Sequence, residues 1–102
     1  LRVRGGLGLK EALREADVLY VTRIQRERFA SEEEYLKVRG SYRLRLEDLK
    51  EASSSLLILH PLPRAGEMDE GVDESPHAAY FKQAAFGVPV RMALLASVTG
   101  RA

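Results

Sequence analysis

The order of apolar and polar positions along the chain predicts short helices that alternate with short strands. Residues 9–16 place leucines and alanines at the spacing of one helix face. The apolar runs 18–21 and 56–59 are typical of strands buried on both faces. A second helix is expected at 32–38, where a serine and a glutamate have the spacing of a capping box, and a third at 46–52.

The remaining segments complete an α/β pattern. Two prolines force residues 60–64 out of the sheet, and residues 65–76 are predicted to be a polar surface stretch. From residue 77 onward the chain is expected to be helical and split near Gly87 and Pro89. Two apolar strands separated by helical segments predict a parallel βαβ sheet with flanking helices, in a single domain of residues 1–102.

Composition excludes several classes of function. The 102 residues carry 16 Lys and Arg against 15 Asp and Glu, so we expect no nucleic-acid or membrane partner. There is no cysteine, and two histidines cannot close a zinc site, so we expect no metal and no cofactor. The beginning of the chain has no signal-peptide pattern and no Met, which indicates a soluble intracellular protein present as a fragment or a processed chain.

Candidate chemistry lies where the two predicted strands end. Parallel strands end at the same sheet edge, where open α/β sheets bind ligands. The first strand is followed by Arg23 and Gln25, and the second by 61–63 and Arg64. Guanidinium groups bind carboxylates or phosphates in bidentate fashion, and carbonyls freed by the prolines can accept from an amine. This edge therefore suits a small anion with an N–H donor, such as an amino acid.

Each of these features also has a purely structural interpretation. Arg23 taken alone is more typical of a solvated or ion-paired surface residue than of a binding residue, and the two prolines are also consistent with a simple turn. His60 at a strand end favours a buried structural histidine over a general base. The glycine-rich start at 4–8 lacks a preceding strand, which disfavours a phosphate loop. The charged stretch 26–39 is typical of a solvated surface and not of a binding patch.

Several segments together resemble the catalytic chain of aspartate carbamoyltransferases. The likeness runs from about residue 9 to the C-terminus, in the order and spacing of that family, and corresponds to about the last third of the family's chain. The segments that carry it are 16–28, 60–64, 72–73, 75–84, Gly87 and 91–95.

The resemblance implies a partial aspartate/ornithine carbamoyltransferase-type domain, the C-terminal part of the aspartate-binding domain. Such enzymes are cytoplasmic homotrimers that transfer the carbamoyl group of carbamoyl phosphate to the amine of L-aspartate in pyrimidine biosynthesis, with active sites between subunits. By motif position, Arg23 would bind an aspartate carboxylate with help from Gln25. Pro61, Leu62 and Pro63 would present backbone groups to carbamoyl phosphate, and Arg64 would support that loop. No catalytic side chain is assigned to this chain, because catalysis would rest on positioning and charge stabilisation.

Departures from the family pattern predict an incomplete protein. Gly66 replaces an acidic or amide residue that helps to hold a mobile loop, and Phe86 replaces a small polar residue. The family's phosphate-binding Ser-x-Arg-Thr-Arg, its His-Pro-x-Gln segment and the lysine lent by a neighbouring subunit are absent from these residues. Segment 78–100 is apolar around its whole axis near its end, so we expect it to pack on a missing carbamoyl-phosphate domain. The chain alone is expected to be inactive.

Two other functions fit the same residues. One is a non-catalytic α/β module that binds an amino acid or docks on a partner. The other is an ornithine-type carbamoyltransferase, which Pro61 and Arg64 disfavour because that relative has His-Cys-Leu-Pro at the second loop and an acidic pocket.

Overall fold

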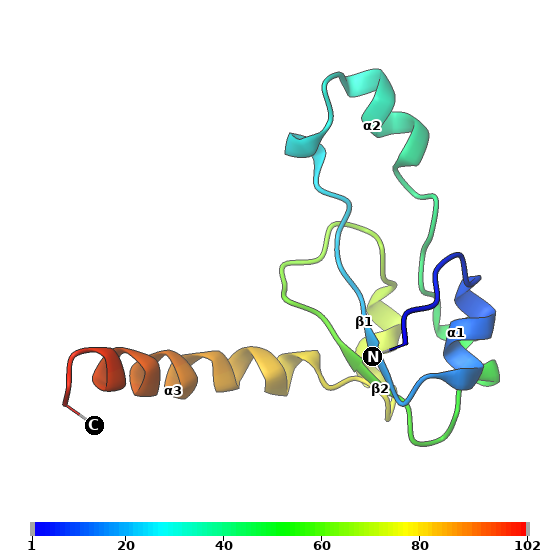
Figure 1. Cartoon of the computed structure of the whole chain (residues 1–102). Helices are drawn as coiled ribbons and strands as arrows, with labels where there is room; N and C mark the ends of the chain where they lie inside the picture. The colour runs from blue at the N-terminus through cyan, green and yellow to red at the C-terminus, as the bar shows by residue number, and fades with distance from the viewer. Residues whose placement is uncertain (1, 102) are drawn as a thin grey trace.

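The computed structural model describes residues 2–101 and centres on a two-stranded parallel sheet (Figure 1). Strand β1 (Val18–Tyr20) pairs with β2 (Leu57–Leu59), with Leu19 opposite Ile58. The predicted parallel βαβ arrangement is therefore confirmed. Around the sheet lie the helices α1 (Leu9–Glu15), α2 (Glu32–Val38) and α3 (Tyr80–Val98) and the 3₁₀ helices η1 (Arg26–Arg28), η2 (Leu46–Glu51) and η3 (Glu70–Glu74).

The strands are less buried than the sequence predicts. Ile58 is fully buried, but Val18 and Tyr20 are 50% and 54% exposed, and Leu57 is exposed as well. Because successive side chains of a strand point to opposite faces, one face of the sheet packs on the core and the other is open. The expectation of strands buried on both faces is thus wrong for the residues described, because the side chains of Val18, Tyr20 and Leu57 on the second face are about half exposed.

The core forms between α1, the sheet and the segments after it. Leu13 of α1 and Ile58 of β2 are both 0% exposed. Met68 and Val72 are also buried, although they lie in the stretch predicted to be polar surface. Backbone hydrogen bonds explain this difference. The amide of Leu44 donates to the carbonyl of Glu67, and the amide of Asp69 donates to the carbonyl of Leu44, so this stretch packs against the core. Among residues 2–101, the buried core consists of Leu13, Val21, Leu44, Leu49, Leu56, Ile58, Met68, Val72 and Tyr80.

The helices follow the sequence in position but not always in type. The bounds of α2 match the prediction, and Ser31 Oγ accepts from the amide of Glu34 at 3.3 Å as the capping pattern requires. The segment predicted to be a helix at 46–52 is a 3₁₀ helix over Leu46–Glu51. Helix α3 runs unbroken through Gly87 and Pro89, so the predicted split is wrong. Proline removes one helical hydrogen bond, and the turns on both sides continue the helix.

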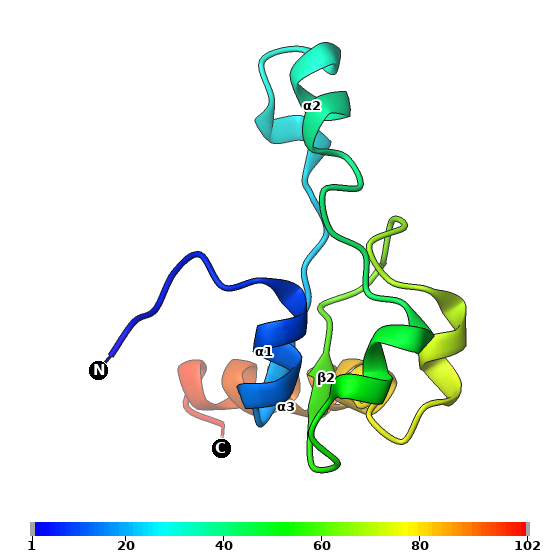
Figure 2. The ribbon, with the colours of Figure 1, turned by 90° about the vertical axis from the view of Figure 1, so that its right-hand side faces the viewer.

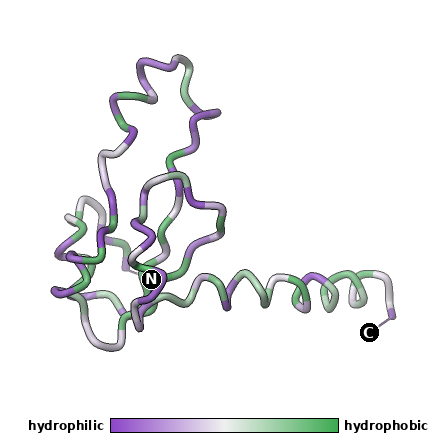
Figure 3. The backbone as a smooth tube through the Cα atoms, turned by 180° about the vertical axis from the view of Figure 1, so that it is seen from behind, coloured by the Kyte–Doolittle hydropathy of each residue, from purple (hydrophilic) through white to green (hydrophobic). Residues whose placement is uncertain are grey.

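The chain is not compact. Its radius of gyration is 16.6 Å, against about 13 Å for a compact domain of this length. Two elements explain the excess, because α2 lies away from the sheet at the end of an extended segment and α3 projects from the sheet in a different direction (Figures 1 and 2). Apolar residues are distributed along α3 (Figure 3), and most of them are more than half exposed. Within residues 2–101, no helix combines the length and the apolar character needed to cross a membrane.

Candidate functional site

The two predicted loops leave the sheet at one edge. The parallel register continues past β1, where the amide of Val21 donates to the carbonyl of Leu59 at 2.9 Å. Arg23 and Gln25 follow β1, and residues 60–64 follow β2. The geometry on which the sequence argument depends, two strand ends at a common edge, is therefore present.

Arg23 is an exposed residue that holds a surface ion pair. Its Nη2 lies 3.0 Å from Oε1 of Glu27, and its side chain is 41% exposed. Gln25 is half-buried and precedes η1. An exposed ion pair of this kind contributes little to stability, so the guanidinium can exchange Glu27 for another carboxylate at small cost.

The loop after β2 is held from within by two buried side chains. Nε2 of His60 lies 2.6 Å from Oε1 of Glu67, and Oε2 of Glu67 accepts from the amide of Ala65 at 2.9 Å. Burial alone would raise the pKa of Glu67, but hydrogen bonds from the amides of Glu67 and Ala65 and from His60 outweigh it and lower that pKa. His60 is thus a buried structural histidine, as the sequence favours.

Arg64 does not face a ligand, because Asp73 occupies its guanidinium. Its Nη1 and Nη2 both donate to Asp73, the latter at 2.7 Å, and the hydroxyl of Tyr80 donates to the same carboxylate. The bonds from Arg64 lower the pKa of Asp73, and that carboxylate raises the pKa of Arg64. Burial, together with the bond to Asp73, raises the pKa of Tyr80 to about 12. Of the two guanidinium groups expected at the edge, only that of Arg23 is exposed and free to exchange its partner.

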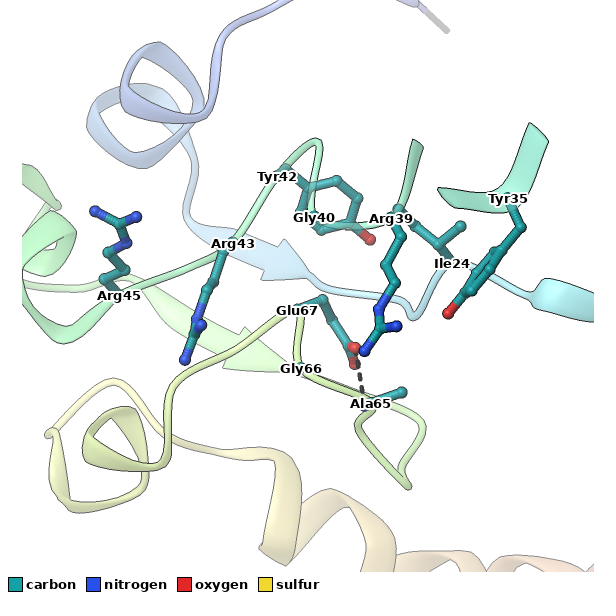
Figure 4. A pocket seen from close by; sticks show the side chains of 10 residues that line it. All are labelled: Ile24, Tyr35, Arg39, Gly40, Tyr42, Arg43, Arg45, Ala65, Gly66 and Glu67. Carbon is teal, nitrogen blue, oxygen red and sulfur yellow. Dashed lines mark hydrogen bonds between the residues drawn. The ribbon is translucent and has the colours of Figure 1, made fainter. Parts of the chain in front are cut away.

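A cavity of about 440 Å³ lies between the arm after β1 and the loop after β2 (Figure 4). Ile24 lines it from the first loop and Ala65, Gly66 and Glu67 from the second. Arg23 and Gln25 do not line it, and neither do residues 61–64. The cavity therefore adjoins the predicted site without containing its residues. Its other lining residues are Tyr35, Arg39, Gly40, Tyr42, Arg43 and Arg45.

The lining changes how the charged stretch 26–39 is interpreted. Arg39 and Tyr35 contribute to the cavity, although the sequence predicts that this stretch is solvated surface only. Figure 4 shows the Arg39 side chain extending toward Ala65 and Glu67. Gly66 also lines the cavity, and a Cβ at that position would meet no atom within 4 Å, so the space next to Gly66 is open.

Three residues that the sequence analysis did not single out connect the site. Asp73 anchors Arg64, and Glu67 closes the loop after β2. Gln83 of α3 joins both strand ends, because its Oε1 accepts from the amide of His60 at 2.9 Å and its Nε2 donates to the hydroxyl of Tyr20 at 3.2 Å. Asp73 and Gln83 both lie in the segments that carry the family resemblance, which is the one signal that points to them.

The structure is an α/β chain in which two loops leave the carboxyl edge of parallel strands, the edge at which open α/β sheets commonly bind ligands. The family model "Aspartate/ornithine carbamoyltransferase, Asp/Orn binding domain" matches residues 7–98. The chain belongs to this family.

Similar proteins and solved structures are named aspartate carbamoyltransferase or aspartate transcarbamoylase. The chain is 61% identical to the aspartate carbamoyltransferase catalytic subunit of Hyperthermus butylicus, over 99% of this chain and 32% of the relative. It is 58% identical to that of Archaeoglobus fulgidus, over 88% of this chain and 30% of the relative. The Trypanosoma cruzi aspartate transcarbamoylase in complex with carbamoyl phosphate and aspartate matches with a TM-score of 0.76 and 37% identity, over 84% of this chain and 28% of that chain. The M. jannaschii catalytic subunit matches with a TM-score of 0.69 and 50% identity, over 85% and 28%.

These similarities concern only part of each relative. The chain spans about a third of the length of the curated relatives it matches. The matched part is the aspartate/ornithine-binding domain.

Proposed function

We propose that this chain is the C-terminal part of the aspartate-binding domain of an aspartate carbamoyltransferase. The reaction joins the amine nitrogen of L-aspartate to the carbonyl carbon of carbamoyl phosphate. The carbon–oxygen bond to phosphate breaks, and the amine loses a proton. The observation that carries the proposal is the identity of about 60% with catalytic subunits of that name. A neighbour whose structure holds both carbamoyl phosphate and aspartate supports the choice of substrates.

Arg23 and Gln25 are the proposed aspartate-binding residues. A guanidinium group matches a carboxylate with two parallel hydrogen bonds, and L-aspartate carries two carboxylates. Nη2 of Arg23 donates to Oε1 of Glu27 at 3.0 Å. Binding then replaces one carboxylate with another and leaves no charge unpaired except that of Glu27, which is 58% exposed and is readily solvated.

Pro61, Leu62 and Pro63 are the proposed contacts for carbamoyl phosphate. Pro61 and Pro63 are exposed, and neither has an amide hydrogen that could bind a sheet partner. Their carbonyls and that of Leu62 can therefore accept from the carbamoyl NH₂ group. Arg64 supports this loop through Asp73 and does not meet the substrate.

Helix α3 is the proposed contact with the carbamoyl-phosphate domain. Val88, Val90 and Met92 are each more than half exposed, and so are Leu94 and Leu95. A helix that exposes apolar residues around its axis is stable in water only when other elements cover it. Segment 78–100 would then be buried against the part of the catalytic chain that residues 1–102 do not include. Assembly as a homotrimer in the cytoplasm follows from the same proposal.

The test compares Arg23 with Arg26, two arginines of the segment that follows β1, in the complete catalytic chain. Arg23→Ala raises the KM for aspartate by roughly tenfold or more, the loss expected for hydrogen bonds between charged groups, and leaves the KM for carbamoyl phosphate unchanged. Arg26→Ala, which removes an exposed guanidinium paired with Glu32, stays within about twofold of wild type. The assay follows formation of carbamoyl aspartate.

Three outcomes would contradict the proposal. An unchanged KM for aspartate in the Arg23→Ala variant refutes the residue assignment. Turnover of ornithine in place of aspartate points to the ornithine-type enzyme. Calorimetric binding of aspartate with no turnover of the complete chain points to a non-catalytic module. The 102-residue chain alone is expected to be inactive, and substantial turnover by it would contradict the role given to the missing domain.

A further inference from the structure

One buried side-chain pair closes the loop that follows β2. His60 is 1% exposed and Glu67 is 6% exposed. The 2.6 Å bond between Nε2 of His60 and Oε1 of Glu67 joins the first and the last residue of the loop 60–67. Within residues 2–101, no buried side-chain nitrogen or oxygen lacks a hydrogen-bond partner. The pair therefore lies inside the protein and is fully satisfied, which makes direct contact with a ligand unnecessary for its stability.

Two backbone amides of the loop determine how the pair is protonated. The amide of Leu62 donates to Nδ1 of His60 at 2.8 Å, and the amide of Ala65 donates to Oε2 of Glu67 at 2.9 Å. A backbone N–H can only donate, so Nδ1 must be the unprotonated ring nitrogen. Nε2 then carries the proton and donates it to Glu67. The imidazole acts as a neutral connector between the Leu62 amide and the carboxylate.

Leu62 needs such a connection because of its backbone conformation. Its φ is 51°, in the left-handed region that residues other than glycine rarely occupy. A residue held there persists only when its surroundings fix it. The bond from its amide to His60 spans two residues, like the turn in which an asparagine side chain accepts from the second amide after it.

Gln83 extends this arrangement to both strand ends. Its side-chain oxygen accepts from the amide of His60, and its side-chain nitrogen donates to Tyr20 at the end of β1. The position of His60 is thus set relative to the segment that carries Arg23. Every bond in the series comes from residues of this chain.

We propose that His60 is a positioning residue that fixes the Leu62 backbone for carbamoyl phosphate, and that Glu67 holds the Ala65 end of the same loop. The inference rests on the proposed function, in which Pro61, Leu62 and Pro63 meet that substrate. Neither side chain is given a contact with substrate, because His60 is 1% exposed and both carboxylate oxygens of Glu67 are already bonded within the loop. Their effect passes through the Leu62 amide on one side and the Ala65 amide on the other.

The experiment separates the two bonds of the imidazole with a pair of variants in the complete catalytic chain. His60→Asn places an acceptor oxygen near the position of Nδ1 and keeps the bond to Leu62, but it loses the bond to Glu67. His60→Gln places an amide N–H near Nε2 and keeps the bond to Glu67, but it loses the acceptor for Leu62. The control is His77→Gln, which removes another buried imidazole, bonded to the carbonyl of Leu56 at 2.9 Å away from the loop.

Steady-state kinetics supply the first measurement. We expect His60→Gln to raise the KM for carbamoyl phosphate by roughly three- to tenfold, the range for one lost neutral hydrogen bond, with a smaller change in kcat. His60→Asn restores the KM to within about twofold of wild type, and His77→Gln leaves it unchanged. Equal effects of both His60 variants, or an effect of His77→Gln as large as theirs, would overturn the proposal, because a loss of stability alone moves all three together.

Amide exchange supplies a second measurement that needs no turnover. We expect the Leu62 amide to exchange with solvent at least several-fold faster in His60→Gln than in His60→Asn. We expect the Ala65 amide to exchange faster in Glu67→Gln than in wild type, because a glutamine side chain offers one acceptor oxygen where Glu67 offers two to its two donors. Unchanged exchange in both cases overturns the inference. An inactive wild-type chain with the expected exchange pattern refutes the proposed function and the role toward carbamoyl phosphate, whereas normal wild-type kinetics with unaffected His60 variants refutes this inference alone.

Discussion

Asp73 offers the sharpest test of how the loop after β2 is anchored. Its carboxylate accepts from both terminal nitrogens of Arg64 and from the hydroxyl of Tyr80. The substitution Asp73→Asn keeps the shape of the side chain but removes its charge, and it places an NH₂ group against a guanidinium that can only donate. One hydrogen bond to Arg64 and the whole charge interaction are lost.

The burial of the pair sets the size of the effect. The side chains of Arg64 and Asp73 are 22% and 24% exposed. Exposed ion pairs contribute about 0–1 kcal/mol, and breaking a fully buried pair costs about 3–5 kcal/mol. We therefore expect Asp73→Asn to lower the free energy of unfolding by about 2 kcal/mol. For a domain of this size that corresponds to a fall in Tm of about 8–16 °C.

Urea unfolding of the complete catalytic chain, followed by circular dichroism, measures this change. The matched control is Asp69→Asn, because Asp69 pairs with Arg43, whose side chain is 55% exposed. That variant should lose no more than about 1 kcal/mol. Equal losses in the two variants would refute the assigned role of burial.

Acid pH gives the same prediction a second check. The pKa of Asp73 is lowered from 3.8, so its contribution is present above about pH 4 and is lost as pH falls through the folded-state pKa. The difference between the unfolding free energies of wild type and Asp73→Asn should therefore narrow as the pH falls below about 4. A difference that stays constant over this range would show that the lost stability does not come from the ionised carboxylate.

Two further predictions concern Tyr80 and Ser31. The pKa of Tyr80 is raised to about 12, so its contribution is present below about pH 10 and is lost as pH rises toward 12. Urea titrations at each pH should show the unfolding free energy of wild type falling by about 2–3 kcal/mol over that interval, and no such fall for Tyr80→Phe. Equal pH dependence of the unfolding free energy in the two proteins would contradict this prediction. Ser31→Ala removes the cap of α2, which contributes about 1 kcal/mol to the helix, so the Glu34 amide should exchange faster. Because α2 buries no residue, the urea midpoint of global unfolding should stay unchanged. A lower midpoint would show that α2 is coupled to the core.

The elements that the sequence predicts well are those with a local signal. The spacing of Leu13 on one helix face and the serine cap of α2 depend on neighbours within one or two turns. The strands β1 and β2 are short apolar runs, and their parallel pairing follows from the helical segments between them. Likewise, Arg23 and Pro61 could be placed at one edge because the rule for parallel strands needs no atomic detail.

The predictions that fail depend on contacts between distant residues. Met68 and Val72 lie in a polar run with no helical or strand period, and they are buried because Leu44 pairs with their segment. The guanidinium of Arg64 is engaged by Asp73, nine residues away, and no spacing rule predicts that bond. Gln83 reaches Tyr20 across 63 positions. Such bonds depend on how the elements pack in three dimensions.

The loop and its surroundings differ in what they need from the rest of a catalytic chain. His60, Glu67 and Gln83 fix the loop with bonds made inside residues 2–101. The open sheet face at Val18 and the apolar length of α3 have no cover among those residues. A two-stranded parallel sheet is rarely stable unless both of its faces are covered. Under the proposed function, association with a carbamoyl-phosphate domain would add stability mainly through these apolar surfaces, while the loop proposed to contact carbamoyl phosphate already has its shape before that domain binds.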